Sequence, residues 1–333
     1  MQSEAGTHKR IVLVGNPNVG KSVIFRLLTG SYVLVSNFPG TTVEISRGDV
    51  RIGDEKYEVV DTPGVNSLVP QSEDERVTCE MLLAEKPDLI LQIADAKNLR
   101  RTLLITSQLA EFRIPMVLVL NMMDEAEERG VEVDARGLAA RFGVPVVETV
   151  AIYSRGKKKL IQAIQNAAVP RDYIAAALGA RERCCPAKPT RVTPGWLSLE
   201  WLATGDRALC RQLERSCGAD TLSFLNTAIE SYRKENRRSL AREIAAERST
   251  LADAWAGEHR KKRQVRYWDN GSAARSRFWL AVLCAGLVFF LWNEAGALTG
   301  FPNPFRTVSG LIARMADAAE PRPGGFFHSV LFG

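Results

Sequence analysis

The stretch that decides the fold is Gly15-Asn16-Pro17-Asn18-Val19-Gly20-Lys21-Ser22, which fits the pattern GxxxxGKS/T. It lies between an apolar, β-branched run at 10–15 and a helical pattern at 20–29. In that context the glycines allow a tight loop whose backbone N–H groups face phosphate oxygens. Lys21 is expected to reach the β- and γ-phosphates, and the Ser22 hydroxyl to bind magnesium. The stretch therefore predicts a Walker A phosphate loop, with nucleotide-binding residues from Gly15 to Val23.

Short apolar runs alternate with helical patterns from residue 10 to about residue 169. Strands are expected at 10–15, 44–52, 56–61, 89–94, 116–121 and 144–147, and helices at 20–29, 72–84, 99–111, 134–141 and 157–167. This alternation predicts an α/β fold, a P-loop three-layer sandwich with a mostly parallel sheet, over residues 9–169. Ligands of such sheets bind beyond the carboxyl ends of the strands, so the loops there are expected to hold the chemistry.

Two further motifs follow predicted strands at that edge. The first is Asp61-Thr62-Pro63-Gly64, in which a carboxylate is placed to hold magnesium and a glycine amide to sense the γ-phosphate. The second, Asn121-Met122-Met123-Asp124, resembles the NKxD base-reading motif of GTPases. Its aspartate is expected to accept hydrogen bonds from guanine N1 and the 2-amino group, two donors that adenine lacks. Met122 stands where lysine is usual, so aliphatic packing over the base is expected to remain while the ammonium contact is lost.

Two loops complete the predicted site. The sequence at 36–44, Ser-Asn-Phe-Pro-Gly-Thr-Thr-Val-Glu, has the composition of a mobile loop that enters a strand. Thr42, in preference to Thr41, is expected to reach magnesium there once a γ-phosphate is present, beside Ser22 and Asp61. The loop at 149–152 is a degenerate form of the usual Ser-Ala-Lys, and only a backbone contact from Ala151 to the base is expected.

Composition adds limits to this interpretation. The chain has 333 residues, 46% of them apolar, so it can hold more than one domain, and disorder as the dominant state is excluded. Eleven basic and five acidic residues fall between 233 and 266, so that stretch carries the whole net charge of +6. Localised basic charge indicates an anionic membrane or nucleic acid. The six cysteines form no CxxC pair and only three histidines are present, which argues against a zinc site or a disulfide framework.

The part after residue 169 differs in character. Clustered prolines predict a linker at 170–194, and helical periodicity without β-rich runs predicts a small all-α spacer domain at 195–266. Residues 278–301 are almost wholly apolar, with Trp279 and Trp292 near the ends of the apolar core and basic residues before it, which predicts one transmembrane helix. A buried helix of a soluble domain is the alternative, because the uninterrupted apolar run ends at 292. The tail at 302–333 is similar to the start of a second span.

In this order and spacing, the motifs resemble those of translation-factor-like small GTPases. The finer similarity is to the amino-terminal part of the ferrous iron transport protein B family. It is carried by GNPNVGKS at 15–22, NFPGTTVE at 37–44, DTPGVNSLVPQSEDERV at 61–77 and the stretch 87–134. Residues 195–206 are similar to the start of that family's helical spacer domain.

The resemblance implies a GTPase that uses GTP, GDP, Mg²⁺ and K⁺. Asn18 corresponds to the phosphate-loop asparagine that helps coordinate potassium in such enzymes, which adds it to Lys21, Thr42 and Gly64 as a catalytic residue. Val65 stands where Ras-like enzymes have a glutamine that orients water, so hydrolysis is expected to be slow without the cation.

The resemblance also implies a place in ferrous iron uptake. A lone span cannot enclose an ion pathway, so the permease is expected to be absent or truncated. The expected partners are the membrane, the remaining permease domain or a separate transporter chain, and a small accessory protein. An oligomer is left open, and no nucleic acid is expected. The first twenty residues lack an apolar signal core, so the GTPase and spacer domains are expected on the cytoplasmic side of the inner (plasma) membrane.

Two other function classes compete with this interpretation. One is a soluble ribosome-assembly or RNA-associated GTPase that uses the basic stretch 233–266 to bind phosphates. Against it, that stretch has no recognisable RNA-binding module, and its aromatic residues are isolated. The other is an interaction protein with an inactive nucleotide site, against which Lys21, Ser22 and Asp61 are all in place.

Overall fold

A computed structural model describes residues 9–30, 34–171, 195–235, 239–262, 279–288, 290 and 291. The chain divides into two compact units, Met1–Val265 and Arg266–Gly333. Most of the predicted linker at 170–194 and the whole predicted tail at 302–333 lie outside the described residues.

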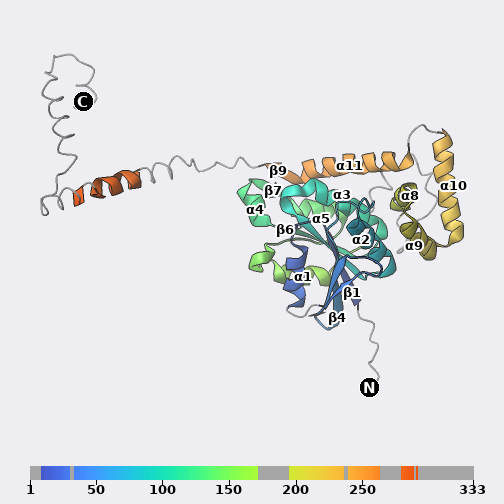
Figure 1. The fold of residues 1–333 in the computed structure, drawn as a ribbon, viewed down its shortest axis with the longest axis horizontal. Coiled ribbons are helices and arrows are strands. Elements are labelled where there is room, and N and C mark those ends of the chain that lie inside the picture. Colours follow the sequence, from blue (N-terminus) through green and yellow to red (C-terminus); the bar gives the residue numbers. More distant parts are fainter. Residues whose placement is uncertain are drawn as a thin grey trace, which may run out of the picture. The chain divides into compact units, whose positions relative to one another are not determined.

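A seven-stranded sheet forms the centre of the first unit (Figure 1). Its strands, in spatial order, are β2 (Leu34–Asn37), β3 (Glu44–Ile52), β4 (Glu55–Asp61), β1 (Lys9–Gly15), β5 (Leu89–Asp95), β6 (Met116–Asn121) and β8 (Val146–Glu148). The pairs from β4 to β8 are parallel, whereas β3 and β2 add an antiparallel edge. The predicted mostly parallel α/β sheet is therefore confirmed, and β2 is an additional strand that begins before the loop expected at 36–44.

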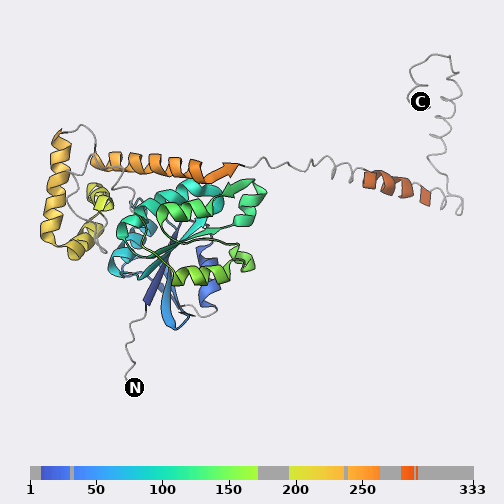
Figure 2. The ribbon, with the colours of Figure 1, turned by 180° about the vertical axis from the view of Figure 1, so that it is seen from behind.

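Helices cover both faces of this sheet (Figures 1 and 2). Side chains alternate along β1, so Val12 and Val14 join one buried cluster while Ile11 and Leu13 join another. The first cluster includes α2 (Glu73–Ala84), α3 (Leu99–Leu109) and α5 (Ala135–Phe142), and the second includes α1 (Lys21–Thr29) and α6 (Lys157–Gln165). Two apolar layers on one sheet give the predicted three-layer sandwich.

Four helices follow in the region that was expected to be an all-α spacer. They are α8 (Gly195–Thr204), α9 (Arg207–Cys217), α10 (Ala219–Glu235) and α11 (Leu240–His259). Their buried side chains belong to the same cluster as those of α2, α3 and α5. The ring of Trp201 lies 6.1 Å from that of Phe112, and Trp255 meets Phe142 edge-on at 5.2 Å. The helices and the sheet domain therefore share one continuous apolar core.

The helical region also contains a strand that its sequence pattern did not predict. After α11, β9 (Arg260–Lys262) pairs antiparallel with β7 (Val131–Val133), which follows α4 (Met123–Glu128). The Asp134 N–H extends this pairing by donating to the His259 carbonyl at 2.9 Å. The basic sequence of β9 has no pattern typical of a strand. The strand is stabilised by backbone pairing with a partner more than a hundred residues away, which a local pattern does not reveal.

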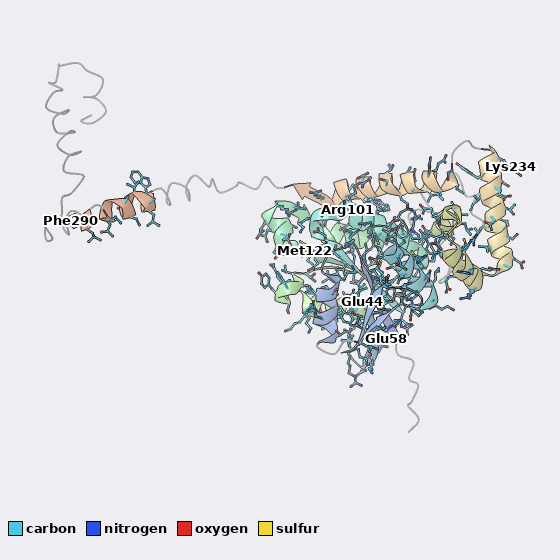
Figure 3. The ribbon with its side chains drawn as sticks, in the orientation of Figure 1. Glu44, Glu58, Arg101, Met122, Lys234 and Phe290 are labelled. Atoms are coloured by element: carbon cyan, nitrogen blue, oxygen red, sulfur yellow. The ribbon has the colours of Figure 1, made fainter. Side chains whose placement is uncertain are left out.

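The second unit contributes a helix over 279–288, with 290 and 291 also helical. Its apolar side chains are exposed, including Leu283 at 70% and Leu280 at 62%, and the Phe290 side chain is seen in Figure 3. Of the span predicted at 278–301, only these residues are described. Within the described part of the chain, the structure has no helix whose length and apolar character would suffice to cross a membrane.

Candidate nucleotide-binding site

The predicted motifs meet at one edge of the sheet. The phosphate loop follows β1, the 61–64 motif lies at the end of β4, the 121–124 motif at the end of β6, and the loop at 149–151 follows β8. These strands are parallel members of one sheet, so their carboxyl ends lie together. The structure therefore brings these four motifs together at the edge where the sequence analysis expected them.

The phosphate loop has the backbone that its sequence requires. Asn18 and Gly20 both adopt left-handed conformations, with φ of 62° and 89°, just before α1 begins. A Cβ atom at Gly20 would lie 2.4 Å from the Asn121 side-chain nitrogen, so this position has space for glycine alone. The loop thus turns sharply into a helix N-terminus, which favours bound anions.

Lys21 is buried inside this loop. Its side-chain nitrogen donates to the Asn16 carbonyl at 3.3 Å, and the residue is 8% exposed. Burial lowers the pKa of the Lys21 ammonium group, although the Asp61 carboxylate acts in the opposite direction. A cation held this way is ready to exchange a weak carbonyl contact for phosphate oxygens.

The 61–64 motif closes directly against the phosphate loop. A Cβ atom at Gly64 would lie 2.8 Å from the Pro17 Cα atom, which explains the glycine. The Val65 N–H donates to the Gly15 carbonyl at 3.0 Å, and the Asn16 side-chain amide donates to the Val65 carbonyl at 3.1 Å. Val65 itself is fully buried, so the position after Gly64 offers no side chain to orient a water molecule.

Ser22 and Asp61 fit a magnesium site. The Ser22 hydroxyl donates to Asp61 Oδ2 at 2.8 Å, while the buried Asp61 Oδ1 has no hydrogen-bond partner among the described residues. Burial raises the pKa of the Asp61 carboxyl, an effect that the Ser22 hydrogen bond and the Lys21 charge partly offset. A hydroxyl and an orphaned carboxylate oxygen side by side are the hard oxygen ligands that Mg²⁺ prefers. When bound, the ion would neutralise phosphate charge at this position.

Asn121 connects the phosphate loop to the loop at 149–151, which is predicted to contact the base. Its side-chain nitrogen donates to the Val19 carbonyl at 3.0 Å, and its oxygen accepts from the Thr149 hydroxyl at 3.1 Å and the Ala151 N–H at 3.0 Å. The Ala151 N–H thus has a partner within the protein, so its predicted contact with a base would have to replace or share this bond. Asp124 lies in the first turn of α4, where its carboxylate is half-buried and available for base recognition.

The magnesium role of Thr42 stays a prediction. The Thr41 hydroxyl is used within its own loop, where it donates to the Phe38 carbonyl at 3.0 Å and accepts from the Val43 N–H at 3.2 Å. Thr42 is exposed beside it. This difference agrees with the choice of Thr42 over Thr41.

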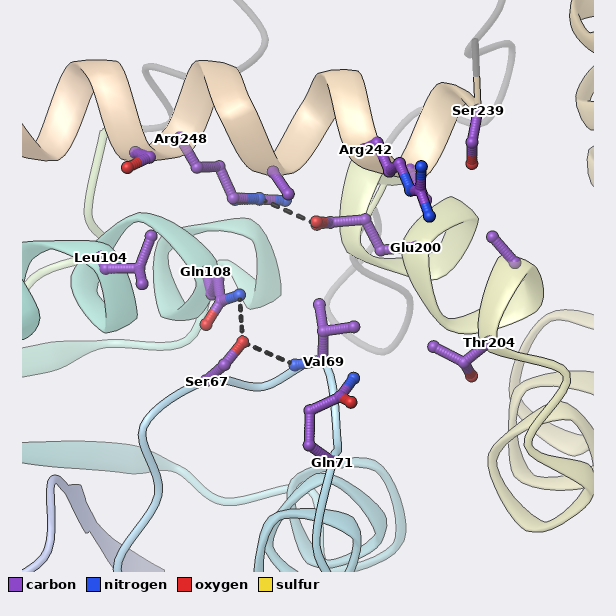
Figure 4. Close-up of a pocket in the computed structure, with 14 residues that line it drawn as sticks. Ser67, Val69, Gln71, Leu104, Gln108, Glu200, Thr204, Ser239, Arg242 and Arg248 are labelled. Atoms are coloured by element: carbon purple, nitrogen blue, oxygen red, sulfur yellow. Dashed lines mark hydrogen bonds and ion pairs between the residues drawn. The ribbon is translucent and has the colours of Figure 1, made fainter.

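The segment that follows Gly64 is held by side chains that sequence reasoning missed. Gln108 on α3 accepts from the Leu68 N–H at 2.8 Å. It also donates to the Ser67 hydroxyl at 3.0 Å (Figure 4). The Trp201 indole on α8 donates to the Leu68 carbonyl, and Glu75 on α2 accepts from the Asn66 N–H at 3.0 Å. A helix of the spacer region therefore touches the segment that adjoins the expected γ-phosphate position.

A buried ionic cluster lies next to this segment. Arg248 on α11 donates to Glu200 on α8 at 2.9 Å (Figure 4). It also pairs with Glu111, which follows α3. These side chains are at most 2% exposed. Burial acts to lower the pKa of the Arg248 guanidinium group, but the two carboxylates outweigh it and raise that pKa. Glu200 and Arg248 line a pocket of about 460 Å³ together with Ser67 and Val69.

A mostly parallel sheet with a Walker A loop, a hydrogen-bonded Ser22–Asp61 pair and an NxxD loop defines a P-loop domain of the GTPase type. Similarity to known proteins identifies the particular family. Residues 9–164 match the family model of ferrous iron transport protein B. This region of the chain belongs to that family, as its amino-terminal GTPase region.

Known proteins agree with this assignment. The Fe(2+) transporter FeoB of Escherichia coli is 40% identical over 160 residues, which are 47% of this chain and 21% of the relative. A fusion of Fe(2+) transport protein A and transporter FeoB from Porphyromonas gingivalis is 42% identical over 156 residues, 46% of this chain and 18% of the relative. The chain thus spans about a fifth of the length of these curated relatives.

Solved structures extend the similarity into the helical region. The cytosolic domain of L. pneumophila FeoB superposes with a TM-score of 0.61 at 28% identity, covering 76% of this chain and all of that one. A mutant S. thermophilus NFeoB bound to GDP has a TM-score of 0.60 at 27% identity, with the same coverage. Since 76% of the chain is more than the sheet domain alone, the similarity extends beyond that domain.

Proposed function

We propose that this chain binds GTP and GDP with Mg²⁺ and hydrolyses GTP. The observation that carries the proposal is the Ser22–Asp61 pair at 2.8 Å beside the buried Lys21, with one carboxylate oxygen left unpartnered. A Mg²⁺ ion bound to a nucleotide would satisfy that oxygen and bring phosphates to Lys21. The GDP-bound S. thermophilus relative supports a guanine nucleotide as the ligand.

Potassium is the proposed activator of hydrolysis. Asn18 is exposed in the phosphate loop and has a left-handed backbone conformation, with φ of 62°. Val65 provides no group to orient water, so charge stabilisation has to come from another source. A monovalent cation held by the Asn18 amide oxygen between the phosphates would supply it.

Replacing Asn18 with Gly is expected to abolish potassium stimulation. Glycine removes the amide oxygen without straining the left-handed backbone, whereas Asn18→Ala would add strain. Steady-state GTP hydrolysis in KCl should fall at least about tenfold, to the rate that the parent chain shows in NaCl. Potassium stimulation that survives in Asn18→Gly would remove Asn18 from the cation site.

We further propose that this GTPase is the regulatory module of a ferrous iron transporter at the inner (plasma) membrane. The relatives named as Fe(2+) transporters are about five times as long as the shared region, so the permease is the proposed partner, on this or another chain. A small accessory protein and an oligomer are further proposed partners. The Trp201 contact with Leu68 is the proposed route by which nucleotide state reaches the helical region.

The exposed apolar helix supports a membrane tether over 278–301. The full chain is expected to leave membranes with detergent and to resist high salt. Leu283→Asp with Leu287→Asp should move it to the soluble fraction, since each charge at a bilayer centre costs about 3 kcal/mol. A chain ending at residue 265, the last residue of the first unit, is the matched control and should be soluble. Release of the full chain by salt alone would contradict the tether and favour peripheral or RNA binding.

A further inference from the structure

The base-reading motif lacks its usual lysine, yet a lysine from another element lies beside it. Lys97 is in the 3₁₀ turn Ala96–Asn98, directly after β5. β5 and β6 are parallel neighbours, and their register places Asp95 opposite Asn121, the first residue of the motif. The turn after β5 therefore runs alongside the residues that follow Asn121.

The ammonium group of Lys97 is fixed by three contacts. Its nitrogen lies 3.6 Å from the Met122 sulfur and 3.7 Å from Asp95 Oδ1, and it pairs with the Glu125 carboxylate. The side chain is only 10% exposed. Asp95 also accepts from the Lys97 backbone N–H at 2.9 Å, which anchors the turn itself. A long side chain held at both ends loses little further entropy when a ligand binds.

The charge of Lys97 matters because its surroundings are acidic. The helix α4 carries Asp124, Glu125, Glu127 and Glu128 within six residues. Nucleotide phosphates are anionic, so uncompensated carboxylates near the base would weaken binding. Among the described residues, a second cation near Glu125 is Arg129, but it is 65% exposed and 4.0 Å away, where solvent screens it.

We propose that Lys97 takes over the role of the missing lysine in the NxxD motif. Its ammonium group holds the Met122 side chain against the face of the base and offsets the Glu125 charge beside Asp124. Lys97 is thus a positioning residue, which acts on guanine nucleotides through Met122. The proposal rests on the guanine-nucleotide binding proposed above.

A double-mutant cycle tests the exchange of roles. The dissociation constants of GDP and of IDP, which lacks the 2-amino group, are measured for the full chain in detergent. The variants are Lys97→Met, Met122→Lys and the two combined. Lys97→Arg keeps the charge, and Lys56→Met removes an exposed lysine that pairs with Asp49 at 2.8 Å near the start of β4, away from the site.

Lys97→Met is expected to weaken GDP and IDP about tenfold each, because stacking and charge are lost equally for both bases. Met122→Lys alone should also weaken GDP, since two ammonium groups would meet at one point. The combined variant restores a lysine at the motif position, so it should bind within about threefold of the parent. Lys97→Arg should do the same, and Lys56→Met should bind GDP unchanged.

Four results would overturn the proposal. Three of them are parent-like GDP binding by Lys97→Met, failure of the combined variant to regain affinity, and GDP binding by Met122→Lys that equals that of the combined variant. The fourth is a loss in Lys97→Met that is confined to GDP, since it would indicate a misplaced Asp124. If the parent itself does not bind GDP, the proposed function fails, which separates that failure from failure of the Lys97 role alone.

Discussion

Asp124→Asn is expected to lower the affinity for GDP by about 100-fold or more and to make XDP the preferred ligand. The carboxylate would accept two hydrogen bonds from guanine, and an amide would present a donor to the 2-amino group instead. Losing a charge-assisted pair and leaving a donor unpaired costs about 3 kcal/mol, which is about 100-fold in affinity. Xanthine carries an oxygen at C2, which the new amide can donate to. Competition between labelled GDP, XDP and ATP measures both effects.

The control for this prediction is on the same helix. Glu128→Gln removes an exposed carboxylate from the last turn of α4 and should leave GDP binding within about twofold, because its charge is screened by solvent. GDP binding that survives in Asp124→Asn would show that the base is read elsewhere. Equal loss of GDP and XDP binding in that variant would indicate damage to the loop. Such damage would break the Asn121 hydrogen bonds and would lower the melting temperature of the protein.

The sequence predicted those parts of the site in which short segments must adopt a particular backbone conformation. Glycine is needed where φ is positive or where a neighbour is close; Gly20 in the Walker A loop meets both conditions, and Gly64 in the 61–64 motif meets the second. Apolar runs of strand length predicted six strands, and all six lie in the sheet with ends shifted by at most two residues. Local propensity and close approach are properties of short segments, so a single sequence contains them.

The parts that the sequence did not predict depend on distant partners. The role inferred for Lys97 depends on its contact with Met122, and the role of Trp201 depends on its contact with Leu68. Likewise, β9 forms only as the pairing partner of β7. None of these pairs has a spacing that repeats or a motif that marks it. The helical region was predicted as a domain because it shows helical periodicity without β-rich runs. Such periodicity does not indicate that its buried side chains belong to the same cluster as those of α2, α3 and α5. Local sequence patterns predict helices and strands, but tertiary contacts determine which of these elements pack together.

Arg248→Met is expected to destabilise the first unit by about 3–5 kcal/mol, because it leaves Glu111 and Glu200 buried without their counter-charge. Glu111 also accepts from the Leu197 N–H at 2.9 Å in the first turn of α8, but a neutral backbone donor does not replace the charge of Arg248 beside a buried carboxylate. The melting temperature should fall by roughly 10 °C for a unit of this size. Circular dichroism on the chain ending at residue 265 measures the change, if that chain is soluble as expected above.

Two matched variants test whether the loss of stability comes from leaving buried carboxylates unpaired or simply from removing one arginine. Arg100→Met removes another arginine between α3 and α11, but its pair with Asp253 is 54% exposed on both sides, so about 1 kcal/mol or less is expected. Combining Arg248→Met with Glu111→Gln and Glu200→Gln removes all three charges and should recover most of the stability. If the triple variant stays as unstable as Arg248→Met, the loss comes from packing of the arginine stem. Recovery by the neutral triple variant would mean that the ionic cluster joins α3, α8 and α11 at a charge-dependent contact, next to the segment that follows Gly64.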